Sequence, residues 1–135
     1  MINRVMFVSR TAAENAAGMS DWAVVSISED AEAKLLDGWY AVHRSYFHDV
    51  DPGSPCGEPH VLMNATHATD IVAFVESVAP HVTGVLVHCK AGISRSAAVA
   101  KWIAERFDLP FNHSCSIYNR NVYRLLCDAT AGDKQ

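Results

Sequence analysis

The sequence has 135 residues, of which 50% are hydrophobic and 19% charged, and its formal net charge is −4. This length corresponds to one domain, residues 1–135, with enough chain to bury a core without disulfides or metals. The acidic balance argues against a function based on whole-protein attraction to nucleic acid or to an anionic membrane, so neither is expected as a partner.

The first third of the chain alternates between apolar runs and turn signals. Residues 5–8 and 22–27 are β-rich and predict two strands, and the alanine-rich segment 11–19 between them predicts a helical turn or two. A cap-like serine followed by acids predicts a short helix over 28–36. The aromatic run 39–47 predicts a third strand, and its mixed polarity places that strand near an edge of the sheet.

A loop rich in proline and glycine separates this strand from the next helix. Three prolines and two glycines between residues 48 and 60 exclude regular structure. Loops of this length inside a small domain are typically functional, so this loop is a candidate part of a site. After the loop, Asn64 or Thr66 caps a helix that ends before Pro80.

The remaining segments complete an alternation of strands and helices. The continuous apolar run 84–88 is typical of a strand buried on both faces of a parallel sheet. A helix is predicted from Ser94 or Arg95 to Phe107, and a last helix over 112–127, with its first residue as the cap. This alternation predicts an α/β domain with a small, mostly parallel central sheet flanked by helices.

Residues 88–96 combine a Cys-x5-Arg spacing with a strand before it and a helix after it. Backbone N–H groups of a loop closing onto a helix N-terminus can point into one concavity and bind a tetrahedral oxyanion. Gly92 offers the positive φ that a tight wrap requires, and Arg95 can bind two phosphate oxygens at once. A thiol at the position of Cys89 typically has its pKa lowered from about 8.5 to about 3.5–7.5, which makes it a nucleophile for phosphoryl transfer.

This segment resembles the signature loop of the cysteine-dependent protein tyrosine phosphatases, and residues 91–96 are most similar to its compact dual-specificity branch. The resemblance implies a protein tyrosine phosphatase-like fold in which Cys89 forms a phosphocysteine and Arg95 binds phosphate and stabilises the transition state. It implies that Ser96 helps the thiolate to leave, and that His88 orients the loop and lowers the cysteine pKa. It also implies that backbone N–H groups of the loop donate hydrogen bonds to the substrate phosphate, and these belong to Lys90, Ala91, Gly92, Ile93 and Ser94.

Such an enzyme needs a general acid for the leaving oxygen and then a base for water. In the family this residue is an aspartate on a loop upstream of the signature, and the proline-rich loop offers Asp49 and Asp51. We favour Asp49, because it follows the end of the predicted third strand. Asp51 is the alternative, although its position before Pro52 is also typical of a turn opener.

The other three cysteines, at 56, 115 and 127, form no Cys-x-x-Cys pair with each other or with Cys89. This spacing argues against a zinc or iron–sulfur site, so no metal and no cofactor are expected. One of the three can still trap an oxidised Cys89 as a disulfide. The chain has no signal-peptide pattern and no run of about 18 apolar residues, so we expect a cytoplasmic protein with reduced thiols and no membrane span.

The leading functional prediction is a protein phosphatase that hydrolyses phosphotyrosine, and also phosphoserine and phosphothreonine, without a metal. The first alternative is a phosphatase for a non-protein phosphoester, such as a phosphoinositide or an RNA 5′-phosphate. Lipid-directed relatives carry a more basic loop, and Ile93 stands where a second lysine would indicate them. The second alternative is a phosphate-binding module with weak or lost turnover. Rhodanese-type enzymes have one residue fewer between Cys and Arg, which disfavours sulfur transfer.

Overall fold

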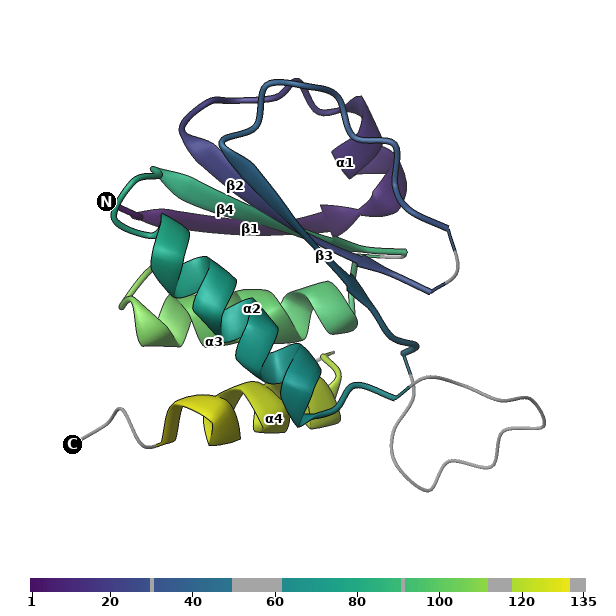
Figure 1. Ribbon diagram of the computed structural model, residues 1–135, viewed down its shortest axis with the longest axis vertical. Helices are drawn as coiled ribbons and strands as arrows, with labels where there is room; N and C mark the ends of the chain where they lie inside the picture. Colours follow the sequence, from purple (N-terminus) through teal and green to yellow (C-terminus); the bar gives the residue numbers. More distant parts are fainter. Residues whose placement is uncertain (30, 50–61, 91, 112–117, 132–135) are drawn as a thin grey trace.

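The computed structural model describes residues 1–29, 31–49, 62–90, 92–111 and 118–131. They form an α/β structure with four parallel strands, α1 on one face of the sheet and three longer helices on the other (Figure 1). The elements in chain order are β1 (Arg4–Ser9), α1 (Arg10–Asn15), β2 (Trp22–Ser28), β3 (Ala41–Tyr46), α2 (Ala65–Val78), β4 (Gly84–Cys89), α3 (Arg95–Arg106) and α4 (Arg120–Thr130). The predicted class, a small parallel sheet flanked by helices, is confirmed.

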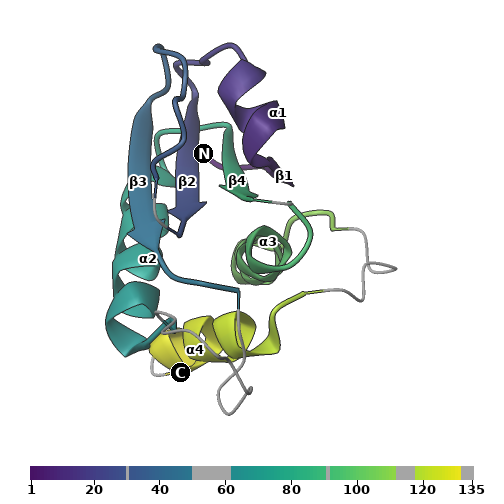
Figure 2. The ribbon, with the colours of Figure 1, turned by 90° about the vertical axis from the view of Figure 1, so that its right-hand side faces the viewer.

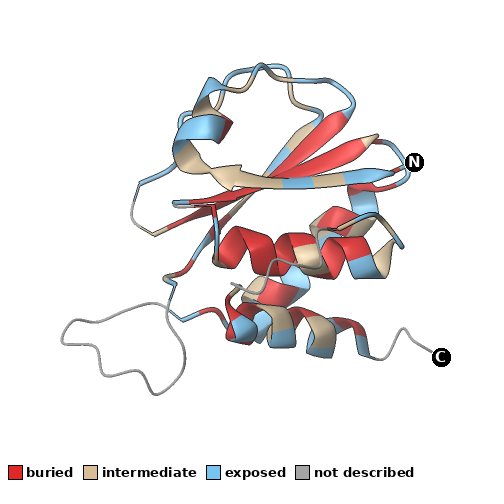
Figure 3. Ribbon diagram, turned by 180° about the vertical axis from the view of Figure 1, so that it is seen from behind, coloured by how far each residue is buried: buried red, intermediate tan, exposed pale blue. Residues whose placement is uncertain are grey.

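The strands lie in the order β1-β4-β2-β3, so β4, the last strand along the described residues, lies between the first two. The register pairs Ser9 of β1 with Cys89 of β4, and Ser26 of β2 with His88 of β4. Every residue of β2 and β4 is buried, as their continuous apolar sequences predict (Figure 3). β3 is an edge strand, as its mixed polarity indicated.

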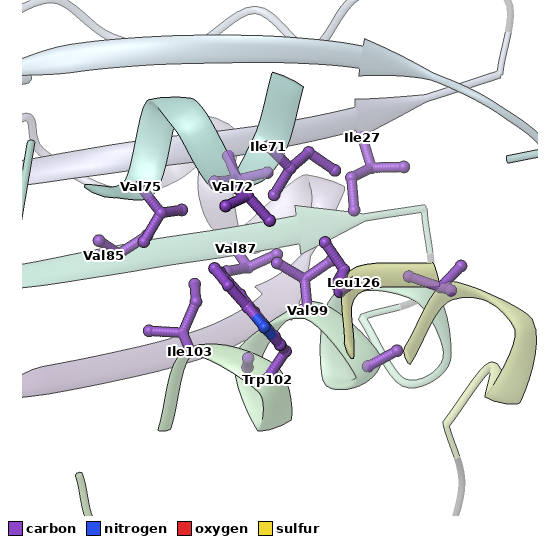
Figure 4. Close-up of a cluster of buried hydrophobic side chains, with 14 of the residues drawn as sticks. Ile27, Ile71, Val72, Val75, Val85, Val87, Val99, Trp102, Ile103 and Leu126 are labelled. Atoms are coloured by element: carbon purple, nitrogen blue, oxygen red, sulfur yellow. The ribbon is translucent and has the colours of Figure 1, made fainter. Parts of the chain in front are cut away.

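The main core lies between the sheet and the three longer helices. Alternate side chains of the central strands point into it and meet the apolar faces of these helices. Figure 4 shows part of this cluster, including Ile27, Ile71, Val87, Val99 and Leu126. The other face of the sheet has a smaller core made by Ala13, Trp22, Val24 and Leu86, with Leu35 and Trp39 packed against it.

The predicted helix over 28–36 is wrong. Residue 28 ends β2, and residues 31–36 are irregular. The guanidinium of Arg10 donates to the carbonyls of Ala31 and Glu32, and Arg44 donates to that of Ala33. A helix of this length is marginal in water, so side-chain bonds to its carbonyls are enough to hold the segment in another conformation.

The structure also shows where two other helices begin. The last helix begins at Arg120, and its cap is Asn119, seven residues after the predicted cap; residues 112–117 lie outside the described residues. Asn64, rather than Thr66, caps α2, because its side chain accepts from the backbone N–H groups of Thr66 and His67. None of the helices in the described ranges is long and apolar enough to span a membrane.

Candidate active site

Segments that follow the four strands meet at one edge of the sheet. All four strands run in the same direction, so the residues after their carboxyl ends lie together (Figure 2). Arg10 follows β1, Glu29 follows β2, Asp49 lies shortly after β3, and Cys89 ends β4. The candidate site is built at this edge, where α3 also begins.

Cys89 is 2% exposed and has hydrogen-bond partners on its sulfur. The backbone N–H of Gly92 donates to Sγ at 3.3 Å, and the Ser96 Oγ lies 3.2 Å from it. Burial alone raises the pKa of the Cys89 thiol, but the hydrogen bonds from Ser96 and Gly92 and the charge of Arg95 outweigh it and hold that pKa below its usual value. This environment favours a thiolate, which is the nucleophilic form of cysteine.

Gly92 brings the loop down onto β1. Its φ is +75°, a conformation that side chains rarely adopt, and this confirms the expected positive φ. A Cβ added at this position would lie 2.3 Å from the backbone nitrogen of Ser9 and 2.6 Å from the carbonyl oxygen of Val8. The backbone of Arg10 also donates to the carbonyl of Lys90 at 3.2 Å. The loop is therefore supported directly by the end of the first strand.

Arg95 is 3% exposed, and its guanidinium is held from two sides. Nη1 donates to the carbonyl of Phe47 at 2.9 Å, and Nη2 lies 3.4 Å from a carboxylate oxygen of Glu29. The buried Nε has no hydrogen-bond partner among the described residues. A buried donor without a partner is costly, so this N–H is a ready contact for an oxyanion in the loop.

The other loop residues differ in exposure and partners. Lys90 is exposed, and Ile93 is 55% exposed, whereas Ala91 lies outside the described residues. Ser94 stands at the N-cap of α3 without a side-chain capping bond. Its hydroxyl donates instead to the Asp49 carboxylate at 2.8 Å, which brings the favoured acid candidate against the loop.

Asp49 is held by a second donor from the far end of the chain. Its Oδ1 accepts from Asn119 Nδ2 at 2.8 Å as well as from Ser94. Asn119 is 6% exposed, so this donor is buried. The alternative acid, Asp51, lies outside the described residues.

His88 is fully buried on β4, where its Nε2 lies 2.6 Å from the Ser26 hydroxyl of β2. Burial lowers the pKa of His88, an effect that its interaction with the Cys89 backbone opposes in part. The imidazole is therefore neutral at pH 7 and braces the end of β4 from within the sheet. This position suits an orienting residue, because the ring has no path to a substrate.

A cavity of about 220 Å³ opens beside the loop. Three cations face it, Arg10, Lys90 and Arg95, with Glu29 as an acidic neighbour. The rest of its lining comes from the end of β2, Ile27 and Ser28. The protein has a net charge of −4, but these three cations make the potential at this edge of the sheet locally positive.

The residues of the site that were not predicted from the sequence include Glu29, Ser26 and Asn119. The sequence indicated Glu29 as an acid in the first turn of a helix. Its position directly after an apolar strand was the better guide, because residues after the carboxyl ends of parallel strands lie at the edge of the sheet where ligands bind. Ser26 interrupts an apolar strand, and a polar residue inside such a run signals a buried partner. Asn119 carried no comparable signal, because its partners are distant in sequence.

The described residues contain no group of three or more His, Cys, Asp or Glu that could hold a metal ion. Of the other cysteines, Cys127 is half-buried on α4, and residues 56 and 115 lie outside the described residues. The chain matches no model of a known protein family, and no curated protein matches it.

Proposed function

We propose that the protein is a phosphatase of the cysteine-dependent tyrosine phosphatase type. In this proposal it hydrolyses phosphotyrosine in proteins, and also phosphoserine and phosphothreonine, through a phosphocysteine on Cys89. The observation that carries the proposal is a buried thiol with a lowered pKa, bonded to Gly92 and Ser96 at the start of a helix, next to the buried guanidinium of Arg95. A thiolate and an arginine at one anion-binding loop are the groups that phosphoryl transfer needs.

The first step forms a sulfur–phosphorus bond and breaks the ester bond. The Cys89 thiolate attacks phosphorus, and the proton on Asp49 goes to the leaving oxygen. The backbone amides of the loop and the Arg95 guanidinium stabilise the charge on the three remaining phosphate oxygens. Asp49 is then ionised, and the dephosphorylated substrate leaves.

The second step returns the enzyme to its starting state. Asp49 accepts a proton from water, the oxygen of that water attacks phosphorus, and the sulfur–phosphorus bond breaks. The Ser96 hydroxyl donates to the departing thiolate, so it lowers the energy of the leaving group. The products are inorganic phosphate, a thiolate on Cys89 and a protonated Asp49.

The exposed surface beside the loop supports a phosphorylated side chain as the substrate. Ile93 exposes more than half of its surface next to the anion site, and an apolar contact there suits the ring of phosphotyrosine. An inositol ring with several phosphates would instead place a charged group against this residue. The Cys89 thiolate must stay reduced to attack phosphorus, so we assign the enzyme to the cytoplasm.

Hydrolysis of an aryl phosphate in the presence of EDTA tests the mechanism. The wild type should be active, Cys89→Ser should lose all activity, and Asp49→Asn should lose the alkaline limb of the pH–rate profile. Rapid acid quenching followed by mass spectrometry should find phosphate on the peptide that contains Cys89. Activity that survives Cys89→Ser rules out the phosphocysteine.

A substrate panel then separates the candidate functions. Phosphotyrosyl, phosphoseryl and phosphothreonyl peptides are compared with a phosphoinositide and a 5′-phosphorylated RNA. A preference for either non-protein ester refutes the protein phosphatase assignment. Binding of vanadate without turnover of any member of the panel identifies a phosphate-binding module.

A further inference from the structure

Asn119 is bonded at each of its polar groups. Its backbone N–H donates to the carbonyl of Ser94 at 3.1 Å, and its side-chain Nδ2 donates to Asp49 at 2.8 Å. Its side-chain oxygen accepts from the N–H of Val122 at 3.1 Å, and its carbonyl accepts from Tyr123 at 3.1 Å. One buried residue therefore joins the phosphate loop, the segment after β3 and the first turn of α4.

Asp49 depends on this arrangement because its own side chain is exposed. An exposed carboxylate samples several rotamers, and ordering it requires contacts that outweigh the lost entropy. Both donors, from Ser94 and Asn119, reach the same oxygen, Oδ1. Oδ1 is an acceptor whether the group is ionised or protonated, so Oδ2 is left to carry the proton.

We infer that Asn119 is the positioning residue of the general acid: it holds the Asp49 carboxyl against the phosphate loop through both steps of catalysis. This inference rests on the proposed function. Ser94 alone does not supply the same restraint, since its hydroxyl rotates freely about one bond and belongs to the loop that the substrate occupies. The amide of Asn119 is fixed from behind by the N-cap of α4.

Asn119→Ser is the variant that isolates this role. Serine is as good an N-cap as asparagine, so the start of α4 and the backbone bond to Ser94 are kept, while the donor to Asp49 is lost. Asn121→Ser is the matched control. Asn121 is equally buried on the same helix, and its side-chain oxygen accepts from Arg124 instead.

Two aryl esters separate proton donation from the rest of catalysis. The leaving group of phenyl phosphate has a pKa of about 10 and needs a proton, whereas dinitrophenol is far more acidic and leaves as an anion. We expect Asn119→Ser to lower kcat for phenyl phosphate by roughly 10- to 100-fold and to spare the dinitrophenyl ester. In an Asp49→Asn background the same change should have no further effect. Asn121→Ser should not alter the ratio between the two esters.

Side-chain coupling constants of Asp49, measured by NMR, test the contact without relying on activity. The bonds from Ser94 and Asn119 hold the carboxyl in one place, so the wild type should show a single χ1 rotamer at Asp49, and Asn119→Ser should show averaging between rotamers. If the wild type hydrolyses both esters and Asn119→Ser keeps the wild-type ratio, the inference is wrong and the proposed function stands. If the wild type hydrolyses neither ester, the proposed function is wrong, and an unchanged Asp49 rotamer in Asn119→Ser overturns the positioning role as well.

Discussion

Replacing Ser96 with alanine tests how the fold produces a thiolate. The Ser96 hydroxyl lies 3.2 Å from the Cys89 sulfur, and both side chains are buried. A hydrogen bond to a charged group contributes about 1.5–3 kcal/mol, and one pKa unit corresponds to about 1.4 kcal/mol. Ser96→Ala should therefore cost the thiolate about 1.5–3 kcal/mol of stabilisation and raise the pKa of Cys89. The Gly92 N–H and the charge of Arg95 should still keep that pKa below the value that burial alone would give.

The pKa is measured from the rate of alkylation by iodoacetamide as a function of pH. Mass spectrometry of the peptide containing Cys89 distinguishes it from Cys127 and the other cysteines. Ser94→Ala is the matched control, because the Ser94 hydroxyl donates to Asp49 and not to the thiol. Ser94→Ala should leave the thiol titration in place, and an unchanged titration in Ser96→Ala refutes the role of its hydroxyl.

The same change has a signature in stability. The pKa of Cys89 is lower in the folded chain than in the unfolded one, so ionisation adds stability above the unfolded thiol pKa of about 8.5 and loses it as pH falls through the folded value. The stability that Ser96→Ala costs should therefore be larger at alkaline pH than at acidic pH. Urea unfolding of both proteins across this range measures the difference, and a cost independent of pH contradicts the argument.

Three further variants test the support of the site and the core. Gly92→Ala places a Cβ 2.3 Å from the Ser9 backbone nitrogen at a φ of +75°, so binding of vanadate, measured by calorimetry, should be lost. Glu29→Gln leaves the buried charge of Arg95 without its ion pair, so Tm should fall, and inorganic phosphate should raise the Tm of this variant more than that of the wild type. Leu126→Ala removes a fully buried side chain and should lower the free energy of unfolding by about 2–5 kcal/mol in urea titrations, with the site chemistry retained.

The strands and the sheet class could be predicted because burial leaves a direct trace in the sequence. The run at 84–88 is apolar throughout since β4 is covered on both faces, and the mixed polarity of residues 39–47 reflects an edge strand. The prediction of a helix over 28–36 was wrong because hydrogen bonds from Arg10 and Arg44 outweigh the local helix signals. Both arginines lie outside the predicted helix, so its own sequence does not show these bonds.

The loop of the site was visible in the sequence, but its supports were not. Cys89, Gly92 and Arg95 lie within one short segment, so their spacing alone indicates an anion site. The contact between Asn119 and Asp49 joins residues 70 positions apart. A pairing of that kind depends on how helices pack around the sheet, and no local pattern encodes it.

The position of β4 in the sheet has a consequence for how the protein reaches its native state. β1 and β2 come first along the chain, but they do not pair with each other, and both pair with the strand that ends at Cys89. During synthesis the sheet therefore stays incomplete until this strand has left the ribosome, and long-range parallel pairing of this kind is slow. Pairing of β4 with β1 and β2 completes the sheet and places Cys89 at its carboxyl edge. An intermediate that lacks this pairing also lacks the support that the end of β1 gives to the loop around Cys89.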